Sequence, residues 1–220
     1  MTDGLRPGVL FDMDGTLVDT NYLHSLAWSR ALRDAGEWAP MNAIHRLIGM
    51  GGDQLVPELL GHDAAEATAA RPGRYKELRG DIRAFPDAAA LLRQLHDLGP
   101  AVVLATSAPE DELAVLRKVL DADDAIDGQT TADQVESSKP DPEVFIVAME
   151  TSSIDPRRAL AIGDSVWDIQ AARGAGIGCI TVESGGFSQH ELSEAGSVRV
   201  YRDVAELLAQ LQTSPLTALL

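Results

Sequence analysis

The sequence predicts an α/β protein in which a parallel sheet core is interrupted by an inserted all-helical domain. Short, continuous apolar runs alternate with amphipathic helical patterns over most of the chain, which is typical of a parallel sheet covered by helices on both faces. One long block breaks this alternation, because nothing between Asp19 and Asp81 resembles a strand. A chain of 220 residues, 45% of them hydrophobic, can bury a core of this kind.

The first strand is expected at Gly8–Phe11, an apolar run that ends at Asp12 and leads into a tight loop through Gly15. Helical patterns follow it, punctuated by glycines, at 21–36, 41–48, 54–60 and 64–79. We therefore divide the chain into a discontinuous core, residues 1–17 and 84–220, and an inserted helical domain, residues 18–83.

The rest of the chain alternates regularly between the two kinds of element. Strands are expected at 101–105, 125–129, 159–162 and 178–182, and a weaker one at 198–201. Helices are expected at 88–98, 110–120, 143–149, 166–174 and 204–212. The tail after Gln212 is expected to fray.

The chain is acidic, with 34 Asp and Glu against 18 Lys and Arg and a net charge of −16. This balance argues against nucleic-acid and anionic-membrane partners, since both need a basic surface. The single cysteine, Cys179, excludes an internal disulfide and fits a reducing compartment. No apolar run approaches the roughly 20 residues of a membrane span. We expect a soluble cytoplasmic protein that is a monomer or a homodimer.

Polar residues follow the expected strands at the end where ligands of parallel α/β sheets bind. They are Asp12 and Asp14 after the first strand, Thr106 and Ser107 after the second, and Asp164 with Asp168 after the fourth. Lys139 lies just before a helix in the sequence Ser-Lys-Pro-Asp-Pro. Each fragment alone is weak evidence, but their order and their placement at strand ends together indicate one site.

The chemistry of such a cluster is restrictive. Carboxylates of Asp12, Asp14 and Asp164 brought together repel one another and raise a carboxylate pKa unless a cation offsets them. A hard divalent ion, most naturally Mg²⁺, removes that conflict. Adding Lys139, the Thr106 hydroxyl and the N–H groups of Gly15 and Ser107 gives a site suited to phosphate. One aspartate of the pair can then attack the phosphorus while the other protonates the leaving oxygen.

The segment from Phe11 to Asp19, FDMDGTLVD, resembles the first motif of the haloacid dehalogenase superfamily of phosphohydrolases. Thr106, Lys139 and the segment from Gly163 to Asp168 are similar to its second, third and fourth motifs, so that the resemblance spans residues 9–182. It implies a Rossmann-like parallel sheet core with an inserted all-helical cap domain.

The resemblance also implies roles for individual residues. Asp12 would be the nucleophile that forms an aspartyl-phosphate, and Asp14 the general acid and base. Thr106 and Lys139 would hold the phosphoryl group. The Mg²⁺ ligands would be Asp12, the backbone carbonyl of Asp14 and Asp164, supported by Asp168.

The helical block occupies the position of the cap in the phosphoglycolate phosphatase and β-phosphoglucomutase-like branch. His24 is similar in position to the cap histidine of the mutases, and the loop 48–53, with Gly51 and Gly52, resembles the specificity loop of the cap. Gly52 stands about where a mutase would carry a phosphate-binding arginine, which weakens the mutase interpretation. Arg74 or Lys76 could substitute for that arginine.

We therefore expect a Mg²⁺-dependent phosphatase acting on a small phosphorylated metabolite, such as phosphoglycolate or a sugar phosphate, through an aspartyl-phosphate on Asp12. The nearest alternative is a β-phosphoglucomutase-like phosphosugar mutase that uses the same intermediate. A more remote one is a non-catalytic phosphate-sensing protein or a receiver-like domain, although receivers are shorter and have no helical insertion.

Overall fold

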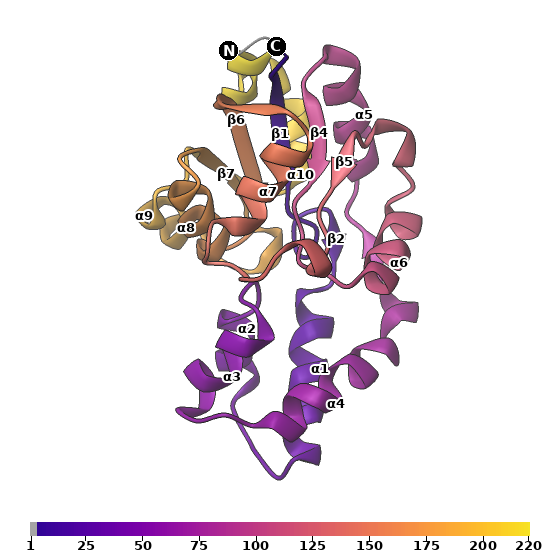
Figure 1. The fold of residues 1–220 in the computed structure, drawn as a ribbon, viewed down its shortest axis with the longest axis vertical. Helices are drawn as coiled ribbons and strands as arrows, with labels where there is room; N and C mark the ends of the chain where they lie inside the picture. The colour runs from indigo at the N-terminus through magenta and orange to yellow at the C-terminus, as the bar shows by residue number, and fades with distance from the viewer. Residues whose placement is uncertain (1–3) are drawn as a thin grey trace.

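The computed structural model describes residues 4–220 and consists of a helix-covered parallel sheet with a group of helices at one end of it (Figure 1). The six-stranded sheet has the order β5-β4-β1-β6-β7-β8, and neighbouring strands run parallel throughout. The strands are β1 (Arg6–Phe11), β4 (Ala101–Leu104), β5 (Gly128–Gln129), β6 (Ile154–Gly163), β7 (Gly178–Val182) and β8 (Arg199–Tyr201). The α/β class predicted from the sequence is confirmed.

Helices bury both faces of this sheet, because successive side chains of a strand point to opposite faces. Val9 and Phe11 of β1 belong to one hydrophobic cluster, and Leu10 belongs to the other. The core helices are α5 (Ala88–Leu98), α6 (Glu110–Leu120), α7 (Glu143–Thr151), α8 (Val166–Gly174), α9 (Gln189–Ala195) and α10 (Val204–Ala209). None of the helices within residues 4–220 is long and apolar enough to cross a membrane.

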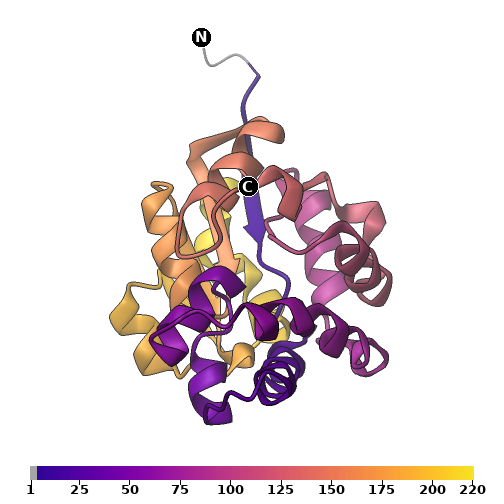
Figure 2. The same cartoon turned by 60° about the horizontal axis from the view of Figure 1, so that its bottom comes forward.

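The insertion after β1 is helical, as predicted, and lies across one end of the sheet (Figure 2). Its helices are α1 (Asn21–Asp34), α2 (Met41–Arg46), α3 (Gly52–Leu60) and α4 (Ala65–Lys76). We call this group the helical cap. It has a small core of its own around Trp28, Leu32 and Ile44. The cap helices therefore bury part of their apolar surface against one another rather than against the sheet.

Two short antiparallel strands join the cap to the sheet. β2 (Val18–Asp19) pairs with β3 (Arg83–Ala84), so the outgoing and returning chain segments lie side by side. This pair lies at the positions where the sequence places the domain boundaries, and the boundaries themselves stay predictions. Of the predicted core segment 1–17, residues 1–3 lie outside the described residues.

The predicted fraying of the tail after Gln212 is wrong. Two 3₁₀ turns, Leu211–Thr213 and Pro215–Leu219, bring Leu216 and Leu219 into the same hydrophobic cluster as Val9 and Phe11. Ser214 connects them, since its hydroxyl accepts the Leu216 N–H at 3.3 Å. Burial of apolar side chains thus orders a segment that has no helical periodicity.

Two other elements differ from the sequence prediction. β6 begins at Ile154, five residues earlier than expected, and α9 was not predicted at all. The helix α9 starts at a capping box in which the Ser188 hydroxyl and the Glu191 carboxylate each bind the other residue's backbone N–H. That serine and glutamate, three positions apart, are a signal present in the sequence.

Candidate active site

A cavity of about 380 Å³ lies between the carboxyl ends of the strands and the helical cap. The core contributes the residues that follow β1 and β4 together with Lys139, and the cap contributes residues of α1, α4 and the loop 48–53. A space of this volume suits a small molecule. The cavity lies at the edge of the sheet where parallel α/β proteins bind ligands.

The loop after β1 sends its two acidic side chains in different directions. Asp12 extends the strand, since its N–H donates to the Ile162 carbonyl at 2.9 Å. The chain then turns through Gly15, whose φ of 78° favours glycine, and the Gly15 N–H donates to the Val18 carbonyl at 2.8 Å. This tight turn separates the carboxylate of Asp12 from that of Asp14, which faces the cap.

Three buried carboxylates gather on the Asp12 side. Oxygens of Asp12, Asp164 and Asp168 lie within 4.8 Å of one another. Lys139 is ion-paired with Asp12, and its Nζ lies 2.7 Å from Asp168 Oδ1. Burial alone would lower the pKa of Lys139, but the charges of Asp12 and Asp168 outweigh it and raise that pKa. The lysine therefore stays charged.

One lysine does not neutralise three acids. Burial raises the pKa of Asp12 to about 7, helped by the charges of Asp168 and Asp14 and opposed by Lys139. Burial and the neighbouring charges of Asp168 and Asp12 likewise raise the pKa of Asp164. A set of converging carboxylate oxygens with uncompensated negative charge fits a hard divalent cation such as Mg²⁺.

Further contacts fix the orientation of these acids. Asn21, the first residue of α1, donates from Nδ2 to Asp164 Oδ2 at 2.8 Å. Asp168 accepts from the Ser165 N–H at 3.1 Å and so caps α8 with one oxygen while its other oxygen faces Lys139. Gly185 packs against Asp164 so closely that a Cβ there would overlap the carboxylate. These contacts therefore hold the carboxylates of Asp164 and Asp168 in position.

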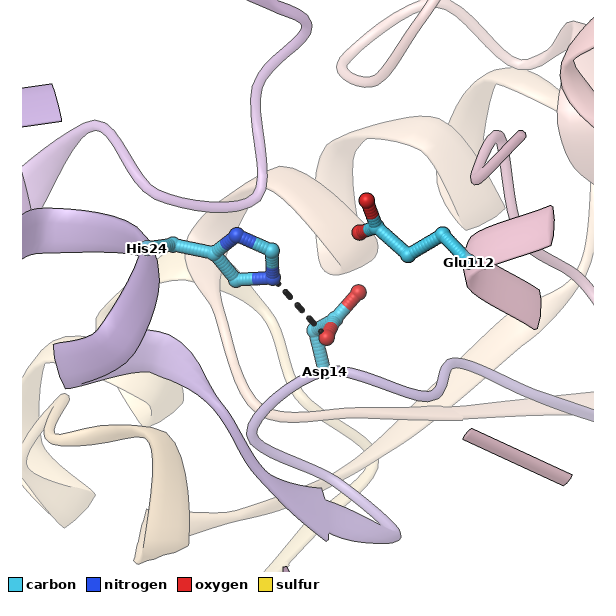
Figure 3. Close-up of side chains that lie close together, drawn as sticks. All are labelled: Asp14, His24 and Glu112. Carbon is cyan, nitrogen blue, oxygen red and sulfur yellow. Dashed lines mark hydrogen bonds and ion pairs between the residues drawn. The ribbon is translucent and has the colours of Figure 1, made fainter. Parts of the chain in front are cut away.

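Asp14 faces a different environment, formed largely by the cap (Figure 3). Its Oδ1 lies 3.0 Å from His24 Nε2 and accepts from the Thr20 hydroxyl at 2.5 Å. Burial would raise the pKa of Asp14, but the electrostatic effect of His24 and the hydrogen bonds from His24 and Thr20 outweigh it. These contacts, with the charge of Arg71, lower the pKa of Asp14 to about 2.

His24 is itself held by α4. Its ring stacks on Tyr75 with the centroids 4.1 Å apart, and Arg71 Nη2 contacts its Nδ1 at 2.5 Å. The His24 ring therefore lies between Arg71, which contacts Nδ1, and Asp14, which contacts Nε2. The inserted segment thus contacts the acid of the core loop through His24 and Thr20.

Most predicted binding residues line the cavity. They are Asp12, Asp14, His24, Gly51, Gly52, Thr106, Ser107 and Lys139. Gly51 packs against Ser138 and Gly52 against Trp28, so these glycines allow the start of α3 to approach the core. Asp164 and Asp168 lie behind Asp12 in the acidic cluster, whereas the Asp14 carboxylate does not join it. A role for the Asp14 backbone carbonyl as a metal ligand stays a prediction.

The structure corrects two expectations about this site. The Gly15 N–H is not free to bind phosphate, because it already donates to Val18 within the turn. Neither Arg74 nor Lys76 supplies a cation to the cavity. Arg74 pairs with Asp34 and Glu77 elsewhere on the cap, and Lys76 is exposed.

The sequence analysis missed several residues of the site, among them Asn21, Arg71 and Glu112. Arg71 and Tyr75 are four positions apart, which places them on one face of α4, and this spacing is a signal that could have found them. Glu112 in the first turn of α6 looks locally like an acid that favours the helix dipole. Nothing in its local sequence predicts that it faces the cavity.

Comparison with known proteins relates this geometry to a family. Residues 7–176 match the family model of haloacid dehalogenase-like hydrolases. A phosphoglycolate phosphatase of Rhodospirillum rubrum is 31% identical to the chain over 219 residues, which covers 90% of this chain and 88% of that protein.

Solved structures agree with this relationship. A hydrolase from Pseudomonas syringae superposes with a TM-score of 0.88 at 34% identity, covering 94% of this chain and 99% of that one. A mutant of CbbY from Rhodobacter sphaeroides in complex with xylulose-(1,5)bisphosphate gives a TM-score of 0.76 at 27% identity. The match covers 92% of this chain and 96% of that one.

Proposed function

The chain belongs to the haloacid dehalogenase-like hydrolases and is a phosphoric monoester hydrolase, and from this premise we propose that it hydrolyses a small phosphomonoester through an aspartyl-phosphate on Asp12. The observation that carries the proposal is the division of the Asp-x-Asp pair. Asp12 faces Lys139 and the acidic cluster, Asp14 faces His24, and both line one cavity. Such an arrangement can place a nucleophile and an acid on opposite sides of one phosphorus atom.

In the first step, a carboxylate oxygen of Asp12 attacks the phosphorus and the bond to the leaving oxygen breaks. Attack requires the ionised carboxylate, which Lys139 favours by its charge. Thr106 and Ser107 line the same cavity as Asp12 and can contact the phosphoryl oxygens. The Thr106 hydroxyl also accepts the Ala108 N–H at 3.1 Å, which fixes its orientation.

Asp14 gives its proton to the leaving oxygen in that step and afterwards takes a proton from the water that attacks the aspartyl-phosphate. That second attack breaks the bond between phosphorus and Asp12 and releases phosphate. Because the pKa of Asp14 is about 2 in the free protein, it must take up its proton when an anionic substrate binds beside it. Nearby negative charge raises a carboxylate pKa in this way.

Asp12, Asp164 and Asp168 are the proposed side-chain ligands of Mg²⁺. When bound, the ion supplies positive charge that offsets these carboxylates and the phosphoryl oxygens. Asn21, Thr16 and Ser165 hold the ligands in position: the Thr16 hydroxyl lies 3.4 Å from oxygens of both Asp12 and Asp164. A cation held there would offset the repulsion among the three acids.

The mutase alternative requires the cap to hold a second phosphate group. Among the described residues that line the cavity, Arg71 is the one cation that the cap contributes, and it faces His24 and the acid Glu112. This supports the phosphatase over the mutase. A requirement for a bisphosphate activator, with isomer formed and no net phosphate released, would favour the mutase instead.

The test is release of inorganic phosphate from a panel of sugar phosphates, phosphoglycolate and nucleotides, with Mg²⁺ and with EDTA. We expect Mg²⁺-dependent release that is abolished in Asp12→Asn. The Asp14→Asn variant should be impaired in both steps, and any phosphorylated enzyme trapped in it should carry the label on Asp12. Inactivity over the whole panel would favour a non-catalytic phosphate-binding protein. The cytoplasmic location and the monomeric or homodimeric state stay predictions.

A further inference from the structure

Glu112 is an unusual residue for the wall of a phosphate site. It lies in the first turn of α6, is only 5% exposed, and lines the cavity. Within residues 4–220 no hydrogen-bond donor reaches its carboxylate, and Arg71 and Arg79 are its nearest cations, each 3.8 Å away. The carboxylate therefore faces the cavity without a hydrogen bond from the described part of the protein, so a ligand bound there can donate one to it.

The position of Glu112 relative to Asp14 indicates which part of a ligand it would meet. Oxygens of Asp14 and Glu112 and a nitrogen of His24 all lie within 4.8 Å of one another (Figure 3). Asp14 is the group that protonates the leaving oxygen in the proposed function. The atoms of the leaving alcohol next to that oxygen therefore come within reach of Glu112.

The charges around this end of the cavity restrict the leaving group further. Asp14 and Glu112 line it with one arginine, Arg71, which already contacts His24 and Glu112. A metal cation between Asp14 and Glu112 is disfavoured by the guanidinium beside them. An anionic leaving group would face an excess of negative charge, and like charges brought together in a buried site are strongly unfavourable.

We propose that Glu112 is a specificity-determining residue: it accepts a hydrogen bond from a hydroxyl group of the leaving alcohol and rejects substrates that place a carboxylate there. This inference rests on the proposed function. It assigns the enzyme to phosphate esters of neutral polyols rather than to phosphate esters of hydroxy acids. A site built to accept from a hydroxyl discriminates strongly against an analogue that cannot donate.

A purely structural role for Glu112 would be to hold the cap against α6 through Arg71 and Arg79. The neighbouring Asp111 offers a control for that role. Its Oδ2 lies 2.9 Å from Arg79 Nη2, and its side chain is 71% exposed and does not line the cavity. Asp111→Asn therefore weakens the contact between the cap and α6 without changing the charge at the leaving group.

The experiment compares two substrate pairs in which a carboxylate replaces a hydroxymethyl group. These are phosphoglycolate with 2-hydroxyethyl phosphate, and 3-phosphoglycerate with glycerol 3-phosphate. We expect kcat/KM of the wild-type protein to favour the hydroxymethyl member of each pair. In Glu112→Gln this preference should fall by about tenfold or more, the effect of losing one charged hydrogen-bond acceptor. Asp111→Asn should change it by less than about threefold, as is usual for an exposed ion pair.

Several results would overturn the inference while leaving the proposed function intact: phosphate release that favours the carboxylate members, a preference unchanged in Glu112→Gln, or one that Asp111→Asn shifts equally. Absence of release by the wild-type protein from these four compounds and from the whole panel of sugar phosphates and nucleotides would overturn both. If Glu112→Gln does not fold, judged by circular dichroism, Glu112→Asp serves in its place. Its retained charge should keep the rejection of carboxylates, and its shorter side chain should lower kcat/KM for the hydroxymethyl members.

Discussion

Asp12 and Asp14 lie two residues apart, and we predict that replacing each by asparagine changes the stability of the metal-free protein in opposite directions. Burial beside Asp168 raises the pKa of Asp12 from 3.8 to about 7. Folding therefore opposes its ionisation, and the stability that the protonated form contributes is lost as the pH rises from about 4 to about 7. At 1.36 kcal/mol per pKa unit, ionised Asp12 costs roughly 4 kcal/mol at pH 8.

Ionised Asp14 contributes to the stability of the folded protein with the opposite sign. His24 and Thr20 more than offset its burial and lower its pKa from 3.8 to about 2. The ionised form then contributes roughly 2 kcal/mol to stability above pH 4, which is lost as the pH falls toward 2. In EDTA at pH 8, Asp12→Asn should raise the free energy of unfolding by up to roughly 4 kcal/mol, and Asp14→Asn should lower it by roughly 2 kcal/mol.

The assay is urea denaturation followed by far-UV circular dichroism at pH 8 and pH 5.5, in EDTA and in excess Mg²⁺. The advantage of Asp12→Asn should shrink to roughly 2 kcal/mol at pH 5.5, where Asp12 is largely protonated in the folded protein. Mg²⁺ should stabilise the wild-type protein more than Asp12→Asn, because a ligand that binds the folded state shifts stability by its affinity. If both substitutions change stability in the same direction in EDTA, the electrostatic description of the site is wrong.

Three further predictions test other parts of the structure. Gly185→Ala places a Cβ against the Asp164 carboxylate, so the Mg²⁺ concentration for half-maximal activity should rise about 10- to 100-fold. Gly80→Ala is the control: its added Cβ meets no atom within 4 Å, so the Mg²⁺ concentration for half-maximal activity should stay unchanged. Leu216→Ala should lower the free energy of unfolding by about 2–5 kcal/mol if the tail is packed as described, and an effect below about 0.5 kcal/mol would mean that it frays. Arg46→Met, which removes an exposed pair with Glu191, should cost less than about 1 kcal/mol in a urea titration.

Local patterns in the sequence were enough to identify most strands of the sheet and the polar residues that follow them. A buried parallel strand is a short apolar run, so Gly8–Phe11 and 101–105 were identifiable without any tertiary information. Because parallel strands share a carboxyl edge, the residues that follow them had to converge. The clustering of Asp12 with Asp164 follows from that rule, whereas Lys139 reaches Asp12 from the loop before α7.

Contacts between the cap and the core were decided by the tertiary structure. Asn21 reaches Asp164, and Arg71 reaches His24, only because the helices of the insertion pack across the end of the sheet. The direction of Glu112 depends on the same packing. A helical pattern shows that a residue lies on a helix, but not which neighbour its face will meet.

The different surroundings of Asp12 and Asp14 depend on both the local sequence and the tertiary structure. The sequence by itself determined that two carboxylates follow the first strand and lie at the ligand-binding edge. Only the tertiary structure decided that the carboxylate of Asp12 joins the acidic cluster beside Lys139 while that of Asp14 meets a histidine from the cap. The physical reason is that a pKa depends on burial and on charges that come from distant parts of the chain. Those partners are brought together by folding, and no local pattern around Asp12 and Asp14 encodes them.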